Sequence, residues 1–576
     1  MFDLKITGGT VVDGTGGSRY VADVAVKDGT IVAIGPSVEG EAVESIDADG
    51  RIVTPGFVDI HTHYDGQATW DELLEPSSGH GVTTIVTGNC GVGFAPVRPG
   101  TEAWLIQLME GVEDIPGTAL AEGMTWDWET FPEYLDVLAG RRFAIDVGSQ
   151  IAHGAVRAYV MGERGARNEP ATSPDIAAMA QIVREAIAAG AFGFSTSRTL
   201  GHRAMDGEPV PGTFAAEDEL FGLGCAVRDG GGGVFELAPA GAAGEDIVAP
   251  HKEVAWMKRL AAETGIPVSF ALLQVDAAPR LYEELMDESL DAFNEGARLV
   301  PQVAARPFGI LIGFGTNHPF ANRPTYRRLA STLPPGELAV ALTKPENRAA
   351  ILGEKDIPGG RGGLGGTIQH ALERVFVLGD PPDYEPTQER SIAAMARASG
   401  EDPMAVLYDR MSERDGRGLL MLPFFSYSDG NHDAIRDMLT HPAGVSGLGD
   451  GGAHCGVICD ASMPTYLLTH WARDRARGPG LELEWVVRKQ TKDTADLYGF
   501  SDRGTITLGK RADLNIIDFE RLQLGQPEVV YDLPAGGRRL IQRANGYTAT
   551  VVAGTVTRRD GADTGARPGR LVRRGG

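Results

Sequence analysis

The spacing of hydrophobic residues changes along the chain and separates its two ends from its centre. Residues 3–50 alternate apolar and polar positions in short runs, broken by turns such as Lys27-Asp28-Gly29. A period of two is typical of half-buried strands, and Gly- and Asp-containing turns join such strands into hairpins. Short runs of the same kind return at 505–509, 512–518 and 548–553. The pattern predicts a small β module at each end, and we expect the two to combine into one β-sandwich.

The centre of the chain alternates apolar β-branched runs with amphipathic helical stretches, which is the pattern of βα units. Clear helical periodicity covers 173–190, with Ser173 as N-cap and Gly190 as stop, and also 215–229 and 251–264. Eight such units predict an α/β fold of the (β/α)8 TIM-barrel type. The eight candidate strands are 52–61, 82–90, 143–153, 191–196, 233–238, 267–273, 298–304 and 445–450.

A long insertion separates the last two candidate strands. Residues 305–444 carry a Gly- and Pro-rich stretch at 358–366 and helical stretches near 388–399 and 402–412. An insertion on the C-terminal face of a barrel usually builds a lid or a substrate pocket, and we favour a lid over a spacer or an oligomer contact. The predicted division of the chain is 1–52 and 501–576 for the two parts of the β-sandwich and 53–500 for the barrel, the insertion included.

Composition narrows the classes of partner. The chain has 576 residues, a net charge of −25 and a pI near 4.9, which argues against nucleic acid and anionic membranes as partners. The four cysteines are too few for a disulfide framework, and the N-terminus lacks the basic and apolar regions of a signal peptide. We therefore expect a soluble cytoplasmic protein, and a homo-oligomer is compatible with the sequence. The basic tail around Arg567–Arg574 is expected to be a solvated end.

Two histidines close the first barrel strand. His61 and His63 follow the apolar run 52–60, and residues two apart on a strand point to the same face. A neutral imidazole is a common ligand of zinc, and a parallel barrel keeps its active site at the carboxyl ends of its strands. A pair of surface histidines is the alternative, which the buried run before them disfavours.

Several other strand ends carry candidate chemistry. Cys90 after the second strand is either a small buried hydrophobe or a thiolate ligand. Glu236 is a carboxylate within an apolar run and a candidate oxygen ligand. Asp450, between glycines at the end of the last strand, suits a metal ligand and a general base that acts on water and then on the leaving group. Candidate substrate-binding residues at strand ends are His153, Arg198 and Arg306, and Arg306 could equally pair with an acidic neighbour.

The remaining histidines lie in predicted helices or loops without a partner at ligand spacing, so we assign them no chemistry. Cys455 and Cys459 follow His454 closely, and without a further cysteine pair we expect them to pack near the pocket floor. The histidines concerned are His80, His202, His251, His318, His370, His432, His441 and His470.

The chain resembles the amidohydrolase superfamily, and within it the D-aminoacylase (N-acyl-D-amino-acid deacylase) branch. The resemblance covers nearly the whole chain. It rests on the stretches Thr54–Asp65, Gly81–Pro96, His153–Arg157, Gly193–Thr196, Arg503–Ile506, Ala512–Leu514 and Gly565–Arg570.

The resemblance implies a zinc-dependent hydrolysis of an amide. By position, His61 and His63 match the metal ligands of strand 1, Cys90 the cysteine ligand of strand 2, and Asp450 the catalytic aspartate of strand 8. The family also places metal-binding histidines on strands 5 and 6, and this chain has none there. The remaining set favours one divalent metal, Zn2+ being the expectation, over two.

The sequence thus predicts a metal-dependent amidohydrolase that cleaves a C–N bond of a small molecule, foremost an N-acyl (D-)amino acid. Alternatives are a cyclic amide as substrate, another metal-assisted reaction on the same barrel, and a non-catalytic barrel that has lost part of its metal site.

Overall fold

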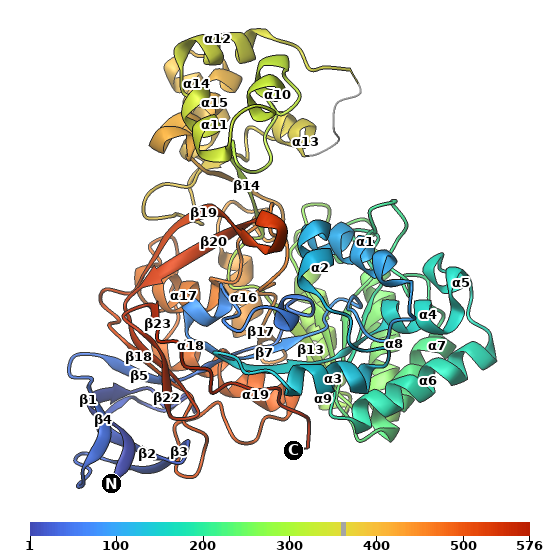
Figure 1. The fold of residues 1–576 in the computed structure, drawn as a ribbon, viewed down its shortest axis with the longest axis vertical. Helices are drawn as coiled ribbons and strands as arrows, with labels where there is room; N and C mark the ends of the chain where they lie inside the picture. Colours follow the sequence, from blue (N-terminus) through green and yellow to red (C-terminus); the bar gives the residue numbers. More distant parts are fainter. Residues whose placement is uncertain (359–363, 576) are drawn as a thin grey trace.

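The computed structural model describes residues 1–358 and 364–575 (Figure 1). Both ends of the chain contribute strands to one nine-stranded sheet, with the order β23-β22-β21-β18-β5-β1-β2-β3 and β4 paired to β1. The two predicted end modules therefore meet in one sheet, while their packing as a sandwich stays a prediction. The strands are β1 (Phe2–Val11), β2 (Tyr20–Lys27), β3 (Thr30–Gly35), β4 (Ala42–Asp47), β5 (Ile52–Pro55), β18 (Leu514–Ile517), β21 (Tyr547–Val552), β22 (Thr555–Arg559) and β23 (Ala562–Asp563).

Each of the eight predicted central strands is present, mostly shorter than predicted, and the predicted strand 143–153 is divided at Gln150 into two, so the two parallel sheets contain nine strands. They form a six-stranded parallel sheet with the order β17-β13-β12-β11-β10-β9 and a three-stranded parallel sheet with the order β6-β7-β8. The strands are β6 (Phe57–Asp59), β7 (Val82–Thr87), β8 (Asp146–Ser149), β9 (Ile151–Ala152), β10 (Gly193–Ser197), β11 (Val234–Ala238), β12 (Val268–Ala271), β13 (Leu299–Val303) and β17 (Val445–Ser446).

The run 52–61 is not one strand, as predicted, but two. It divides at Gly56: β5 pairs with strands of the end sheet, whereas β6 pairs with β7. A Cβ atom at Gly56 would lie 2.1 Å from Oγ1 of Thr83, so only glycine allows this close approach of the two segments. The chain therefore passes from the end sheet to the parallel sheet just before the two histidines.

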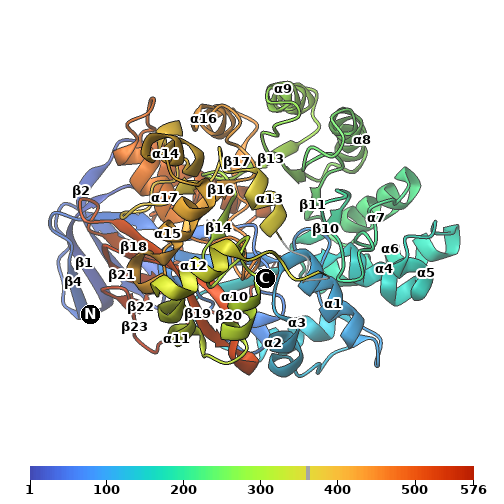
Figure 2. The same cartoon turned by 90° about the horizontal axis from the view of Figure 1, so that it is seen from above.

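Helices follow the central strands on the outside of the sheets (Figure 2). Those at the three predicted positions are α6 (Ser173–Ala188), α7 (Glu217–Asp229) and α8 (Ala249–Thr264). Ser173 is not the N-cap of α6: the Thr172 hydroxyl accepts the hydrogen bond from the Asp175 N–H, and the Asp175 carboxylate accepts one from the Thr172 N–H. This reciprocal pair satisfies two amide groups at once, which explains the shift by one residue. Two further helices of this kind are α4 (His153–Met161) and α9 (Leu281–Asn294).

Most of residues 309–423 of the predicted insertion form a body of their own at the top of Figure 1, whereas Tyr384, Ile435 and Met438 belong to the main hydrophobic core. The antiparallel sheet and helices of this body enclose a separate hydrophobic core, which contains Ile310, Leu342 and Tyr408. Within the predicted Gly- and Pro-rich stretch, residues 359–363 lie outside the described residues. The elements are β14 (Gly309–Ile312), β15 (Phe376–Val377), β16 (Leu420–Pro423), α10 (Pro324–Ala330), α11 (Pro335–Leu342), α12 (Pro345–Gly353), α13 (Gly365–His370), α14 (Ile392–Ser399) and α15 (Pro403–Gly416).

The hairpin of β19 (Gln523–Leu533) and β20 (Gly537–Asn545) was not predicted. It lies next to the insertion (Figure 1), where Arg538 Nη1 donates to the Gly315 carbonyl at 2.7 Å. The basic tail is not a solvated end, because Phe143 pairs with Gly569 and Arg573 donates to the Ala189 carbonyl and to Asp136. No helix among the described residues combines the length and the apolar character needed to cross a bilayer.

Candidate metal centre

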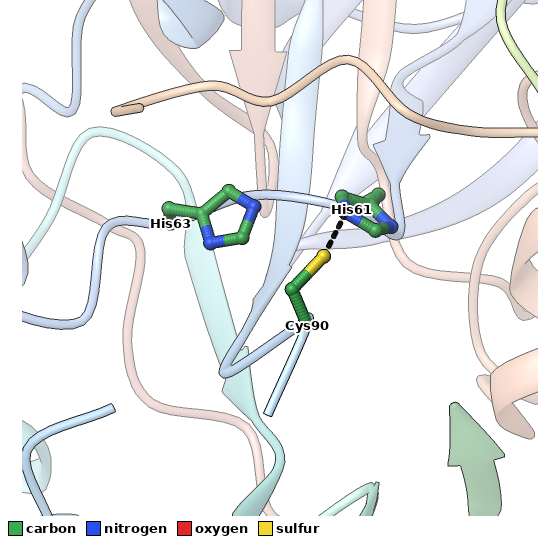
Figure 3. Close-up of side chains that lie close together, drawn as sticks. All are labelled: His61, His63 and Cys90. Atoms are coloured by element: carbon green, nitrogen blue, oxygen red, sulfur yellow. Dashed lines mark hydrogen bonds between the residues drawn. The ribbon is translucent and has the colours of Figure 1, made fainter. Parts of the chain in front are cut away.

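His61 and His63 lie directly after β6, and both side chains are buried (Figure 3). Their rings meet edge to face, with centroids 5.4 Å apart. The Nε2 atoms of both rings approach Oδ1 of Asp450, at 3.4 Å from His61 and 3.7 Å from His63. Burial lowers the pKa of His61 to about 4 and that of His63 to about 3. Both rings are therefore neutral near pH 7, which is the form that binds a metal.

Cys90 follows β7 and brings its thiol to the same place. Its Sγ lies 3.4 Å from Nε2 of His61 (Figure 3), and one ligand atom from each of His61, His63 and Cys90 fits within 4.8 Å of the others. Burial raises the pKa of the Cys90 thiol well above its usual value. The thiolate is the ligand form, so the negative charge of Cys90 needs a cation beside it.

Asp450 completes the centre from the far end of the sheet. Thr62 pairs with Gly451, which sets the loop after β17 beside the histidines. The backbone of Asp450 has a φ of +45°, and that of Cys90 a φ of +55°. Left-handed conformations are uncommon for residues other than glycine, cost about 1–3 kcal/mol each, and gather at functional sites. Two of the four predicted metal ligands thus share a backbone conformation that packing alone does not require.

Gln302 orients the first histidine. Its Oε1 lies 2.9 Å from Nδ1 of His61, and its Nε2 donates to the Ser269 hydroxyl at 3.1 Å. Because the amide nitrogen is used by Ser269, the oxygen accepts the Nδ1–H of His61, and the lone pair of Nε2 faces Cys90 and Asp450. The hydrogen-bond network therefore assigns the tautomer that suits a ligand.

Glu236 lies beside these residues on β11 and is completely buried. Its Oε2 accepts the backbone N–H of Cys90 at 3.0 Å, whereas Oε1 has no hydrogen-bond partner and lies 3.8 Å from Nδ1 of His61. Burial raises the pKa of Glu236 to about 8. Its Oε1 is nearest to Nδ1 of His61, the nitrogen that Gln302 already contacts, and its predicted role as a ligand stays a prediction.

We call the buried site formed by His61, His63, Cys90 and Asp450 the cleft, and two further residues beside it escaped the sequence analysis. Glu113 ends α1 (Glu102–Glu113) and is buried, with Oε1 3.4 Å from Nδ1 of His63 and Oε2 3.5 Å from Nε2 of His454. His454 also lies 3.9 Å from Asp450. A glutamate at the end of an amphipathic helix carries no local signal of a site. The position of His454, four residues after Asp450, was the only available hint.

The cleft contains more negative than positive charge. Among the described residues, the ion-pair partners of Glu113, Glu236 and Asp450 are histidines, with no arginine or lysine among them. Burial raises the pKa of Glu113 well above its usual range, and the carboxylate of Asp450 raises it further. A divalent cation would supply the missing charge, so the imidazole, thiol and carboxylate donors fit a zinc-like metal.

The predicted substrate residues already have partners inside the protein. His153 contacts Thr196 at 2.8 Å and Glu219 at 2.9 Å, which uses both of its ring nitrogens. Arg198 donates to Glu253 at 2.8 Å. Arg306 pairs with Asp460 at 3.1 Å, the acidic neighbour foreseen as an alternative. Their contact with a substrate stays a prediction for all three.

Arg306 retains free binding capacity. Its guanidinium is buried and lies 3.9 Å from the ring centre of Tyr384, and its Nε and Nη1 atoms have no hydrogen-bond partner among the described residues. Asp450 and Asp460 line the same small cavity of about 20 Å³. A much larger cavity of about 480 Å³ lies between α1 and α4, and none of the predicted metal ligands lines it.

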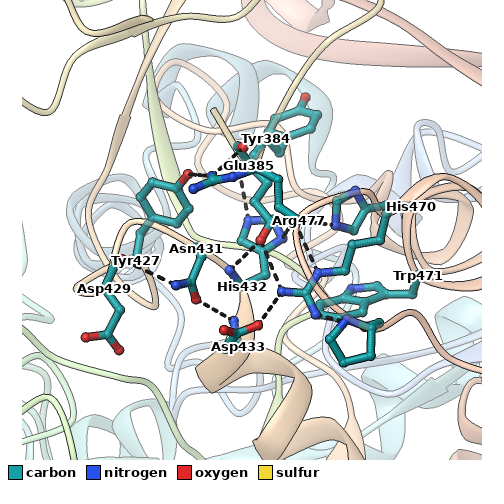
Figure 4. Close-up of polar contacts among 12 residues, drawn as sticks. Tyr384, Glu385, Tyr427, Asp429, Asn431, His432, Asp433, His470, Trp471 and Arg477 are labelled. Carbon is teal, nitrogen blue, oxygen red and sulfur yellow. Dashed lines mark hydrogen bonds and ion pairs between the residues drawn. The ribbon is translucent and has the colours of Figure 1, made fainter. Parts of the chain in front are cut away.

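A second cluster of histidines contradicts the sequence analysis. His432 and His470, assigned no partner, come together with Glu385, and one ligand atom from each residue lies within 4.8 Å of the others (Figure 4). Glu385, His432 and His470 are far apart in the sequence, so no local motif indicates that they meet. In contrast to the cleft, this cluster includes a cation: Arg475 Nη2 lies 3.1 Å from Glu385 Oε1.

Comparison with known proteins gives a consistent picture. A model of the Amidohydrolase family matches residues 44–558. A D-aminoacylase of Alcaligenes xylosoxydans xylosoxydans is 26% identical over 574 residues, covering 100% of this chain and 98% of the relative. A solved D-aminoacylase, described for its binuclear metal centre with one-metal activation and second-metal attenuation, aligns with a TM-score of 0.66 and 23% identity over 100% of both chains.

A solved N-acyl-D-glutamate deacylase from Bordetella bronchiseptica, in complex with zinc and a phosphonate inhibitor, aligns with a TM-score of 0.64 and 22% identity over 99% of both chains. At these identities the two structural likenesses establish a shared mixed α/β fold.

Proposed function

Because the chain belongs to the amidohydrolase family, we propose that it hydrolyses the C–N amide bond of an N-acyl amino acid, with one divalent metal and a water molecule. The observation that carries the proposal is the convergence of His61, His63, Cys90 and Asp450 at one buried place, where no described arginine or lysine forms an ion pair with Asp450. The related D-aminoacylase supports the substrate class, including its D configuration.

His61 and His63 would hold the metal through Nε2, Cys90 through its thiolate, and Asp450 through one carboxylate oxygen. The zinc in the related N-acyl-D-glutamate deacylase supports zinc as the metal, and the one-metal activation described for a related D-aminoacylase supports a single one. When bound, such a metal lowers the pKa of a water molecule and polarises the carbonyl of an amide. Gln302 keeps His61 in the tautomer that this binding requires.

Asp450 acts on the protons of the reaction. One of its oxygens faces the two histidines, and the other lies 3.9 Å from His454. In the proposed mechanism this carboxylate accepts a proton from the attacking water and then donates it to the nitrogen of the leaving amine. Water adds to the acyl carbon and the C–N bond breaks, so the products are a carboxylic acid and an amino acid.

Arg306 is the proposed anchor for the substrate carboxylate. Two buried N–H groups without a partner favour a bidentate contact with a planar anion. Its existing partner Asp460 lines the small cavity beside Asp450, which places this pair near the proposed site of reaction. Burial raises the pKa of Asp460 to about 6, so a proton on Asp460 could offset the second carboxylate when substrate binds.

We infer in addition that the two parallel sheets belong to one closed eight-stranded barrel, with its lid formed by residues 305–444. Only Gln150 separates β8 from β9, and the Thr62–Gly451 bridge links the ends of β6 and β17. Both observations support closure. The domain limits, a cytoplasmic location and the oligomeric state stay predictions.

Replacing Asp450 with Asn tests the function. We expect D450N to lower the release of amine from N-acyl amino acids by about 10²- to 10⁴-fold, because the general base is lost while the shape is kept. D28N is a matched control, since Asp28 also has a positive φ (+49°) but lies in an exposed turn. Full activity of D450N would exclude this mechanism. Wild-type protein that holds zinc but releases no amine from acyl-amino acids or cyclic amides would favour a non-catalytic barrel.

A further inference from the structure

The cluster of Glu385, His432 and His470 links the insertion to the helix that follows the last strand. Glu385 lies in the loop after β15, and His432 directly precedes α16 (Asp433–Thr440). His470 belongs to η4 (Leu467–Asp474), a π-helical segment. All three side chains point toward one another in Figure 4. π-Helical turns are rare and frequently occur at functional sites, so this cluster is a candidate for such a site.

The two carboxylate oxygens of Glu385 differ in their hydrogen bonds: Oε1 accepts two, and Oε2 accepts a single long one. Its Oε1 accepts the backbone N–H of His432 at 2.7 Å and a contact from Arg475 Nη2 at 3.1 Å. Its Oε2 faces Nε2 of His470 at 3.1 Å and Nδ1 of His432 at 3.8 Å, and receives only a long contact of 3.3 Å from Arg475 Nε. Carboxylates that bind metals are held in this way, with outer donors fixing the ligand.

His432 has a defined tautomer. Its Nε2 lies 2.9 Å from the carbonyl oxygen of Tyr384, which can only accept, so Nε2 carries the proton. The lone pair of Nδ1 therefore faces Oε2 of Glu385 and the hydroxyl of Tyr466, the latter at 3.3 Å. Burial lowers the pKa of His432 to about 3, so the ring is neutral. A histidine held by a backbone carbonyl at its other nitrogen is the usual arrangement of a metal ligand.

His470 presents a buried nitrogen without a hydrogen bond. Its Nε2 is inaccessible and makes no hydrogen bond among the described residues, although Glu385 Oε2 is only 3.1 Å away. The ring stacks on Tyr466, with centroids 4.6 Å apart and an interplanar angle of 10°. Its position is thus fixed by packing, and its Nε2 faces the Glu385 carboxylate.

We propose that Glu385 Oε2, His432 Nδ1 and His470 Nε2 form a second metal site, separate from the cleft, which binds a divalent transition-metal ion of the zinc type. Two imidazole nitrogens and one carboxylate oxygen are a donor set of zinc. Donors of a tetrahedral zinc site lie about 3.4 Å apart, given metal–ligand distances of about 2.0–2.2 Å. The present separations, 3.1 and 3.8 Å from Oε2 and all within 4.8 Å, require only small shifts of the rings.

An occupied site would join three segments, the loop that contains Glu385, the start of α16 and η4, because each of them supplies one ligand. The bound ion would take the place of two long contacts, from Arg475 Nε to Glu385 Oε2 and from the Tyr466 hydroxyl to His432 Nδ1. The hydrogen bond from Arg475 Nη2 to Glu385 Oε1 would remain. This inference does not depend on the proposed hydrolysis, since it uses none of the residues of the cleft. Its alternative is an ion-pair network in which Arg475 alone neutralises Glu385.

Zinc stoichiometry tests the site in the full chain. After removal of metals with a chelator, protein is titrated with zinc chloride and the bound zinc is measured after gel filtration. We expect two zinc ions per wild-type chain and one per chain of H470Q. H441Q is the matched control, because the side chain of His441 is 18% exposed and that of His470 15%. The control should bind two.

Cobalt distinguishes the two sites by their ligands. Only the cleft contains a thiol, so a thiolate-to-cobalt absorption band reports Cys90 and should persist in H470Q. If H470Q binds one cobalt ion fewer than wild type but keeps this band, the second site is supported. If a protein lacks the band but still binds cobalt at the second site, only the proposed metal site of the cleft has failed. Circular dichroism checks that the variants fold. His470 is chosen because its side chain is partly exposed, whereas substitution of the fully buried His432 risks unfolding the protein. Zinc binding by H470Q and E385Q equal to that of wild type would overturn the proposal.

Discussion

Two buried clusters of histidine and carboxylate differ in what balances their negative charge. In the cleft, His61, His63 and Asp450 are accompanied by Glu113 and Glu236, and no described arginine or lysine pairs with these carboxylates. Around Glu385, Arg475 supplies a fixed positive charge. A buried carboxylate is costly unless a cation accompanies it. The cleft therefore needs an external cation to hold its carboxylates in the ionised form, whereas the second cluster has its own counter-charge and should bind metal more weakly.

Loss of a cleft ligand should have the largest effect. H63A removes one of the two imidazoles, and we expect a decrease in kcat/KM of about 10³-fold, since a catalytic metal contributes several kcal/mol to the transition state and each tenfold change corresponds to about 1.4 kcal/mol. Assays of amine release together with bound zinc check this. Activity of H63A close to wild type would show that the cleft is not the reaction site.

The two isosteric variants E385Q and E113Q compare the clusters in metal-free protein. E385Q leaves the exposed Asp433 as the only described ion-pair partner of the buried Arg475, so the free energy of unfolding should fall by about 3 kcal/mol. Glu113 pairs with no described arginine or lysine, and burial raises its pKa well above the usual range, so its replacement by a neutral amide of the same shape in E113Q should change this free energy by less than about 1 kcal/mol. Urea denaturation measures both. Equal losses would remove the distinction between the clusters.

A third buried cluster consists of Glu219, His153 and Arg157, and here too an arginine balances the negative charge of the glutamate. We expect acid to weaken it. Burial by itself raises the pKa of Glu219, but its hydrogen bond to His153 and the charges of His153 and Arg157 outweigh this effect and lower the pKa to about 2. The folded pKa lies below the unfolded value near 4.5, so the stabilisation is present above pH 4.5 and is lost as the pH falls toward 2. It amounts to about 3 kcal/mol. Unfolding of wild type and E219Q between pH 5 and 3 checks this, and identical pH slopes would contradict it.

The smallest effect is expected for a residue that acts through a ligand. Q302A removes the acceptor of the His61 Nδ1–H and should weaken zinc binding by about 10- to 100-fold, with little effect on the fold. A competing chelator measures the affinity. Q490A is the matched control, since Gln490 is also buried and its side-chain amide has no hydrogen-bond partner. A similar change in both variants would assign Gln302 a packing role.

The sequence predicted the parts of the molecule that rest on local patterns. Strand periodicity placed His61 and His63 side by side, and strand ends located Cys90 and Asp450, because parallel strands bring their carboxyl ends together. Local patterns could not locate Glu113, which ends a helix inserted after the second strand. They also missed the cluster of Glu385, His432 and His470, which depends on how the insertion packs against a distant helix. The division of 52–61 at Gly56 likewise depends on a tertiary contact with Thr83.

The most direct test of the account is diffraction from crystals of the zinc-loaded protein at the zinc absorption edge. The account predicts an anomalous peak about 2.0–2.1 Å from Nε2 of His61 and of His63 and about 2.3 Å from Sγ of Cys90, with Asp450 in contact. An anomalous map without a peak in this cleft, or with a peak that touches neither Cys90 nor Asp450, would contradict it.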